Sequence, residues 1–129
     1  MSNKHALIVD DNSENTGVLV ELLSLEGLTC TEVQRPSRLA EVLPMLSNLN
    51  VIFLDLEMPG MDGYQVLQLI KSLGHLDGVP VVAYTVHTSE INTARRLGFH
   101  SFLGKPLDAD QFPDQLSRIL NGERVWATF

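Results

Sequence analysis

Short apolar runs alternate with segments of helical spacing along the chain, and this alternation constrains the fold more than any other feature. The runs are rich in strand-forming residues and too short for helices; they cover residues 6–9, 28–33, 51–54, 79–85 and 101–103. Between them, apolar residues recur every three or four positions, as on one face of an amphipathic helix. Strict strand–helix alternation predicts an α/β fold, with a parallel sheet and helices on both faces.

The order of the strands follows from their composition and from the handedness of the crossovers. Residues 51–54 are apolar throughout, which is typical of a central strand that is buried on both faces. Residues 28–33 are more polar, so this strand is expected at an edge. Right-handed crossovers leave few topologies, and the flavodoxin-like, doubly wound five-stranded order 2-1-3-4-5 is common at this size. This order places the first and third strands side by side.

Capping and breaking residues indicate where several of the helices begin or end. Gly27 stops the first helix, Pro44 predicts a kinked or short second helix, and Asp62 can cap the third. The last helix is expected to open at Leu107–Asp108, because Asp108 and Gln111 resemble a capping box. The residues expected on the inner face of the first helix are Val18, Leu19, Leu22, Leu23 and Leu25.

Length and charge limit the function classes that this chain can belong to. Its 129 residues fit one domain with a real core, and its composition is that of a globular protein, with 44% hydrophobic and 19% charged residues. The net charge of −7 argues against direct binding to nucleic acid or to a membrane. The single Cys30 fits a reducing compartment, and no signal-peptide pattern opens the chain, so a cytoplasmic location is expected.

Polar residues stand at the ends of four of the predicted strands. These residues are Asp10 and Asp11 after the first strand, Asp55 after the third, Thr85 at the end of the fourth and Lys105 after the fifth. Ligands of such sheets bind at the carboxyl ends of the strands, where the strand order reverses. The sequence therefore predicts that these side chains meet at one edge of the sheet.

Three carboxylates at one site repel one another unless a cation neutralises them. Mg²⁺ suits this role because it prefers oxygen ligands and binds through one or two carboxylates together with a phosphate. Lys105 offers a point charge for a phosphoryl oxygen, and Thr85 offers a hydroxyl donor. Asp55, between them, can act as a nucleophile that forms an aspartyl-phosphate.

Four segments of the chain resemble the receiver domain of two-component response regulators, including the stand-alone chemotaxis regulators. They are "LIVDDN", "IFLDLEMPGMDG", "VVAYT" and "FLGKPL", in the order that the family has them. The resemblance spans essentially the whole chain. It implies a single receiver domain over residues 1–129, with residues 122–129 as a tail beyond the last helix. Trp126 and Phe129 in that tail either pack on the domain or mark a partner surface.

The resemblance also implies a role for each site residue. Asp55 would be the phosphoacceptor, and Lys105 would contact the phosphoryl group. Thr85 and Phe102 would be the switch residues, with Phe102 turning inward on activation. The ligands of Mg²⁺ would be Asp10, Asp11, Asp55 and the backbone carbonyl of Glu57, with Asp10 acting partly through water. The residues that modulate the site would be Glu57 and His87, at positions that influence the lifetime of the phosphoryl group in the family, and Val86, whose bulk would restrict the path of Thr85.

The partners that the resemblance implies are proteins. The phosphoryl group would come from a histidine kinase or a histidine phosphotransfer protein. The fourth helix, fifth strand and fifth helix would form the face that regulates a downstream protein. The domain would be a monomer or a weak dimer, and it would promote its own phosphorylation and dephosphorylation without being a conventional enzyme. Whether it stands alone or belongs to a larger protein stays open.

Three alternatives compete with this interpretation. A degenerate receiver would act only as a protein-binding module. A small Mg²⁺-dependent phosphatase would use Asp55-Leu56-Glu57, although phosphatases of that type carry the motif after the first strand of a longer domain. A flavin carrier would need a loop rich in Ser, Thr and Gly after the first strand, where this chain has Asp-Asp-Asn-Ser-Glu.

Overall fold

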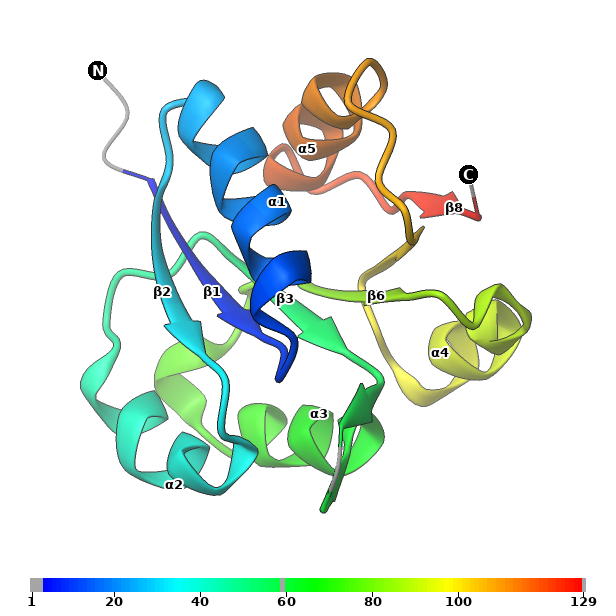
Figure 1. Cartoon of the computed structure of the whole chain (residues 1–129). Coiled ribbons are helices and arrows are strands. Elements are labelled where there is room, and N and C mark those ends of the chain that lie inside the picture. Colours follow the sequence, from blue (N-terminus) through cyan, green and yellow to red (C-terminus); the bar gives the residue numbers. More distant parts are fainter. Residues whose placement is uncertain (1–3, 59, 129) are drawn as a thin grey trace.

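A six-stranded parallel sheet forms the centre of the computed structural model, which describes residues 4–58 and 60–128 (Figure 1). Its strands, in sequence order, are β1 (His5–Val9), β2 (Thr29–Val33), β3 (Val51–Asp55), β6 (Val81–Thr85), β7 (Ser101–Gly104) and β8 (Trp126–Ala127). They lie side by side in the order β2-β1-β3-β6-β7-β8, and every pair is parallel. The first five strands in this order confirm the predicted arrangement 2-1-3-4-5.

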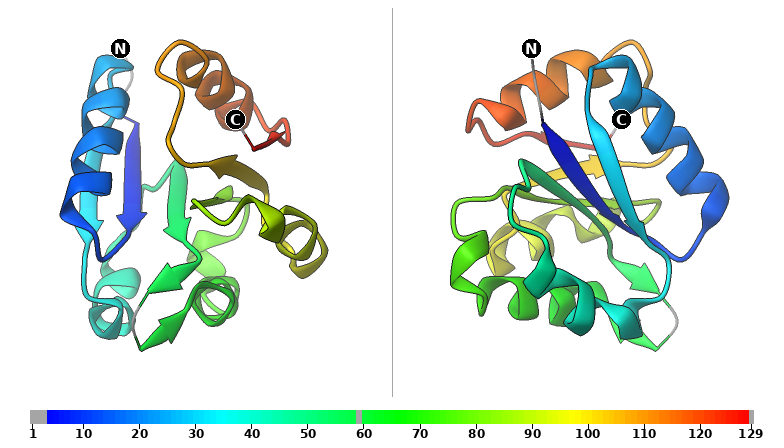
Figure 2. Two further views of the ribbon diagram at one scale, coloured as in Figure 1. Left: turned by 45° about the vertical axis from the view of Figure 1, so that its right-hand side comes forward. Right: turned by 90° about the vertical axis from the view of Figure 1, so that its left-hand side faces the viewer.

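Helices cover both faces of the sheet, as the alternation predicts (Figure 2). The α-helices are α1 (Ser13–Leu25), α2 (Leu39–Val42), α3 (Gly63–Lys71), α4 (Ile91–Leu97) and α5 (Phe112–Leu120). Short 3₁₀ turns are η1 (Pro36–Arg38), η2 (Leu43–Met45), η3 (Gly74–Leu76) and η4 (Thr88–Glu90), and a small hairpin pairs β4 (Glu57–Met58) with β5 (Met61–Asp62). Among the described residues, no helix has the length and apolar character needed to cross a bilayer.

The two faces of the sheet carry separate apolar cores, because successive strand residues point to opposite sides. Helices α1 and α5 pack on one face, where Phe53 of β3 and Tyr84 of β6 are buried. Helices α2, α3 and α4 pack on the other face, where Phe102 of β7 is buried. Every residue of β3 is buried, which confirms its predicted central position.

Several predicted helix boundaries are confirmed. Asp62 caps α3 and accepts a hydrogen bond from the backbone N–H of Tyr64 at 2.8 Å, and Gln65 completes the capping box. Helix α2 has only four residues and continues as the 3₁₀ turn that contains Pro44. Gly27 follows α1 with a φ of 85°, a left-handed conformation that glycine adopts without strain.

One helix prediction is confirmed in part and another is wrong. In α1, Leu19 and Leu23 are buried and Leu22 packs against the core, as predicted, whereas Val18 and Leu25 are exposed and Thr16 is buried. Packing against the sheet selects the buried face. Helix α5 begins at Phe112 instead of Leu107–Asp108, and its N-terminal residue has no side-chain cap. The Asp108 carboxylate accepts backbone N–H groups of the turn that precedes the helix, so it does not form a capping box.

The segment after α5 is part of the sheet and not a free tail. Strand β8 pairs with β7, with Phe102 opposite Trp126. The backbone N–H of Phe102 donates to the carbonyl of Val125 at 2.8 Å. The guanidinium group of Arg95 in α4 lies 4.6 Å from the ring centroid of Trp126. Trp126 therefore packs on the domain, whereas Phe129 lies outside the described residues.

Candidate functional site

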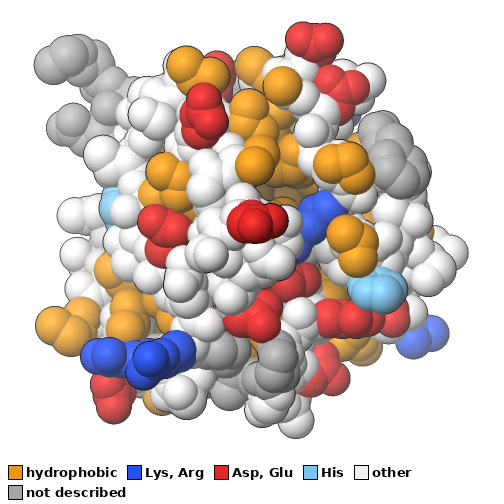
Figure 3. All heavy atoms as spheres, in the orientation of Figure 1, with side chains coloured by type: hydrophobic (Ala, Val, Ile, Leu, Met, Phe, Trp, Pro, Cys, Tyr) orange, Lys and Arg blue, Asp and Glu red, His pale blue; other side chains and the backbone are white. Residues whose placement is uncertain are grey.

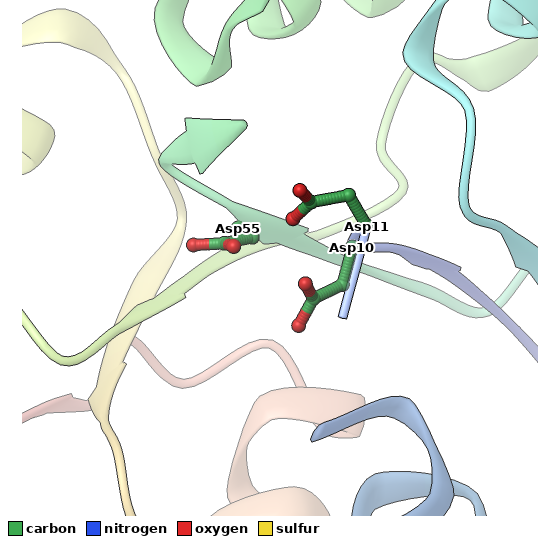
Figure 4. A group of neighbouring side chains, drawn as sticks. All are labelled: Asp10, Asp11 and Asp55. Atoms are coloured by element: carbon green, nitrogen blue, oxygen red, sulfur yellow. The ribbon is translucent and has the colours of Figure 1, made fainter. Parts of the chain in front are cut away.

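Four adjacent strands deliver the predicted site residues to one edge of the sheet. Asp10 follows β1, Asp55 ends β3, Thr85 ends β6 and Lys105 follows β7. Asp11 is next to Asp10, and one ligand atom from each of Asp10, Asp11 and Asp55 lies within 4.8 Å of the others (Figure 4). Asp10 and Asp11 are far from Asp55 in the sequence, and the parallel sheet brings the three side chains together. The predicted cluster of carboxylates is therefore confirmed.

The donor set suits a hard divalent cation. Three carboxylates cluster here, and the buried ammonium group of Lys105 lies near two of them, Asp10 and Asp55, so the cluster has an excess of negative charge when all three acids are ionised. Oxygen ligands of this kind are the ones that Mg²⁺ binds. More acidic side chains gather on the same face of the molecule, as the space-filling view shows (Figure 3). An acidic triad of this composition is typical of the Mg²⁺ sites of receiver domains.

Asp10 is the most enclosed member of the cluster, with no exposed surface. Its Oδ2 atom accepts the hydroxyl of Tyr84 at 2.6 Å and the ammonium group of Lys105 at 3.0 Å. Its Oδ1 atom accepts the backbone N–H of Asn12 at 2.9 Å. Burial acts to raise the pKa of Asp10, but the donors and the charge of Lys105 outweigh it and hold that pKa below its ordinary value. Asp10 is therefore a fixed negative charge.

Asp55 lies in a different environment, although its side chain is close to that of Asp10. Its residue is 7% exposed, its Oδ1 atom accepts the backbone N–H of Glu57 at 3.3 Å, and Lys105 Nζ lies 3.7 Å from its Oδ2 atom. Burial raises the pKa of Asp55 to about 6, against the opposing charge of Lys105, and the neighbouring Asp10 adds to the rise. A bound cation would favour the ionised form that a nucleophilic carboxylate needs.

The two predicted switch residues are both buried, Thr85 at the end of β6 and Phe102 within β7. The Thr85 hydroxyl oxygen accepts a hydrogen bond from the backbone N–H of His87 at 3.1 Å. Phe102 has no exposed surface and packs in the core on the side of α3 and α4. The Lys105–Pro106 peptide bond is cis.

The three residues predicted to modulate the site lie at its exposed margin. His87 Nε2 lies 2.9 Å from a carboxylate oxygen of Glu57, and both side chains are about half exposed. Val86 between Thr85 and His87 is 62% exposed. The structure thus joins two of these positions, which are 30 residues apart in the sequence: Glu57 at the start of β4 and His87 after β6.

Tyr84 is the residue of the site that the sequence did not indicate. It stands inside the apolar run of β6, where an aromatic residue is expected to fill the core. Its ring does so, but its hydroxyl reaches Asp10. A hydroxyl one residue before the end of a strand, next to a predicted polar site, is the signal in the sequence that could have singled it out.

Comparison with known proteins agrees with the fold and the site. The family model "Response regulator receiver domain" matches residues 6–117. A two-component response regulator of Oryza sativa subsp. japonica, ORR6, is 33% identical over 122 residues, which cover 92% of this chain and 72% of that protein. The chemotaxis response regulator CheY4 of Vibrio cholerae has the same fold, with a TM-score of 0.81 at 19% identity over 92% of this chain and 99% of that one.

A further solved structure has this fold and contains a metal ion. It is the receiver domain of the sensor histidine kinase PA1611 from Pseudomonas aeruginosa PAO1, with a magnesium ion coordinated in its active-site cleft. Its TM-score is 0.80 at 22% identity, with coverage of 93% of this chain and 99% of that one. Together with the match over residues 6–117, these findings identify the chain as a member of the response regulator receiver domain family of two-component signalling.

Proposed function

We propose that this chain is a phosphorylation-dependent switch that accepts a phosphoryl group on Asp55. One observation carries the proposal: Asp55 lies beside two further carboxylates and a buried lysine at the carboxyl edge of the sheet. A two-component receiver implies a histidine kinase or a histidine phosphotransfer protein as its partner. The donor in the reaction is then a phosphohistidine.

The reaction needs little protein chemistry beyond positioning and charge neutralisation. An Oδ atom of Asp55 attacks the phosphorus, an O–P bond forms, the P–N bond to the donor histidine breaks, and the leaving imidazole takes up a proton. Lys105, which now lies 3.0 Å from Asp10 and 3.7 Å from Asp55, contacts the transferred group. Thr85 has a hydroxyl hydrogen to donate to a phosphoryl oxygen.

The residues that would hold Mg²⁺ are Asp10, Asp11, Asp55 and the backbone carbonyl of Glu57. When bound, Mg²⁺ neutralises charge on the phosphoryl oxygens. The receiver domain of PA1611, which has the same fold and a magnesium ion in its cleft, supports this assignment. Glu57, Val86 and His87 line the exposed margin, where they would influence access of water to the phosphoryl group.

The output of the switch would be a change of the face formed by α4, β7 and α5. Thr85 and Phe102 lie at the end of β6 and within β7, so movement of Thr85 toward a phosphoryl group would be felt at this face. Phosphorylation shifts the face only as far as the phosphoryl group binds the active arrangement better. A downstream protein would read that difference.

Acetyl phosphate with Mg²⁺, followed by intact mass measurement, tests the proposal. The expected result is one phosphoryl adduct that is lost in Asp55→Asn and retained in Asp77→Asn, since Asp77 is exposed and outside the site. No adduct, from acetyl phosphate or from a phosphorylated phosphotransfer protein, would instead support a binding module. Turnover of a phosphate ester would support a phosphatase.

A further inference from the structure

Tyr84 touches both charged partners of the proposed acceptor. It lies opposite Asp55 in the pairing of β3 with β6, and it is almost completely buried. Its hydroxyl donates to Asp10 at 2.6 Å. The Lys105 ammonium group lies 4.1 Å from the centroid of its ring, at cation–π distance. The edge-to-face contact with Phe53, at 6.2 Å between ring centroids, holds the ring in this orientation.

The hydrogen bonds of Asp10 show what the Tyr84 hydroxyl controls. A carboxylate has about four acceptor sites, two on each oxygen. Tyr84 and Lys105 occupy both sites of Oδ2, and the backbone N–H of Asn12 occupies one site of Oδ1. One site of Oδ1 is left for a cation or for its bound water. Tyr84 therefore fixes the plane of the carboxylate and determines which oxygen remains free.

The same hydroxyl also limits how strongly Asp10 holds Lys105. Both donors share the charge of one oxygen, so each weakens the attraction of the other. Lys105 is 0.7 Å closer to Asp10 than to Asp55, from the distances 3.0 and 3.7 Å. To contact a phosphoryl group on Asp55, the ammonium group has to shift from Asp10 toward Asp55. Without the hydroxyl, Lys105 would be the only donor to Oδ2 from the described part of the chain.

We propose that Tyr84 is a positioning residue of the phosphoryl-transfer site, which orients Asp10 for the cation and keeps Lys105 free to move to Asp55. This inference rests on the proposed function for its kinetic part, whereas its metal-binding part does not. It predicts that Tyr84 acts through Asp10 and Lys105, without contact to the transferred group.

The test compares Tyr84→Phe with Tyr64→Phe. Tyr64 is a matched control, because its hydroxyl donates to the Glu90 carboxylate at 2.8 Å, away from the acidic cluster. Calorimetric titration with Mg²⁺ measures affinity without a phosphodonor. Initial rates of adduct formation from acetyl phosphate are measured over a range of Mg²⁺ concentrations. They give the half-saturating Mg²⁺ concentration and the maximal rate as two separate quantities. Thermal unfolding of each variant reports any loss of structure.

In Tyr84→Phe, we expect the Mg²⁺ dissociation constant to rise about tenfold, as for other residues that orient metal ligands. The maximal rate is expected to fall several-fold, because Lys105 is held more tightly by Asp10. Tyr64→Phe should match the wild type in both. Equal affinity and equal rates for the two variants would overturn the proposal, even if Tyr84→Phe unfolds at a lower temperature. Absence of an adduct in the wild type would refute the proposed function, and the calorimetric comparison would still decide the role of Tyr84.

A spectroscopic test covers the case in which Tyr84→Phe does not fold. The chain has two tyrosines, so 3-fluorotyrosine incorporated into Tyr64→Phe labels Tyr84 alone. We expect its single ¹⁹F resonance to shift on addition of Mg²⁺ and to remain in place with Na⁺ at the same ionic strength. A resonance that Mg²⁺ does not shift would show that Tyr84 is not coupled to the cation site.

Discussion

Lys105 and Asp10 form an ion pair from which water is almost excluded, with 3.0 Å between Nζ and Oδ2 and with side chains that are 8% and 0% exposed. The Lys105 ammonium group is therefore closer to Asp10 than to Asp55, the proposed phosphoryl acceptor, which lies 3.7 Å away. Removing one member of such a pair leaves an uncompensated buried charge, which is far more costly than losing an exposed pair.

Replacing Lys105 with Met therefore destabilises the fold in metal-free buffer. We expect the free energy of unfolding in urea to fall by about 3 to 5 kcal/mol. Added Mg²⁺ should restore part of the loss, because a cation again faces the carboxylates. The control is Lys71→Met, because Lys71 is exposed, and a loss below about 1 kcal/mol is expected there. Equal losses in the two variants would mean that Lys105 is not needed to neutralise the cluster.

Asp55 makes the stability depend on pH in a direction opposite to that of most aspartates. Its pKa rises from 3.8 to about 6 on folding, so between these values the folded state binds more protons than the unfolded state. Its contribution is therefore most favourable below pH 3.8 and is lost as the pH rises through about 6. A difference of this size corresponds to about 2 to 3 kcal/mol.

The variant Asp55→Asn removes the free-energy cost of keeping this buried carboxylate ionised in the folded state. Without metal at pH 7.5, we expect it to be more stable than the wild type by about 2 to 3 kcal/mol at most, the size set by the pKa rise. The advantage should shrink steadily toward pH 4.5, where the wild-type carboxyl is largely protonated. Urea titrations of both proteins across this range measure the difference. A difference that stays constant with pH would contradict the raised pKa of Asp55.

Mg²⁺ should stabilise the folded domain, because only the folded chain brings the three carboxylates together. At a Mg²⁺ concentration 100 times the dissociation constant, the expected gain is about 2.7 kcal/mol. The gain should disappear with a chelator and be much reduced in Asp11→Asn. Asp77→Asn, at an exposed position outside the cluster, should keep it. An identical effect of Na⁺ at equal ionic strength would rule out a specific site.

The missing side chain of Gly104 leaves space for the backbone of Thr128, the residue that follows β8. A Cβ atom at Gly104 would overlap the carbonyl oxygen of Thr128 and lie 3.0 Å from a methyl carbon of Thr88. We therefore expect Gly104→Ala to displace β8 from β7 and to alter the fluorescence of Trp126, the only tryptophan in the chain. Beryllofluoride with Mg²⁺ should also change this fluorescence in the wild type, because Trp126 pairs with Phe102.

The matched control for Gly104→Ala is Gly17→Ala in α1. A Cβ atom there meets no other group within 4 Å, and alanine favours a helix interior by about 1 kcal/mol over glycine. Gly17→Ala should therefore raise the unfolding temperature without any change in Trp126 fluorescence. Gly104→Ala with wild-type fluorescence and stability would show that β8 does not depend on this space.

The residues of the site could be predicted because they interrupt an apolar pattern at strand ends. Asp10, Asp55, Thr85 and Lys105 each end or follow a run of core residues, and parallel strands bring such ends to one edge. Tyr84 could not be predicted in this way. It satisfies the apolar pattern of its strand, and only the tertiary structure, in which β3 lies between β1 and β6, shows which acid its hydroxyl reaches.

The sequence by itself determined the alternation of elements, the strand order and the acids that gather at the edge, because these follow from local spacing and chain handedness. The tertiary structure decided the buried stripe of α1, the late start of α5 and the pairing of β8, because packing energy selects among alternatives of equal local propensity. It also decided that Lys105 lies nearer to Asp10 than to Asp55. This preference depends on charge and burial at a site that forms only when distant segments of the chain meet.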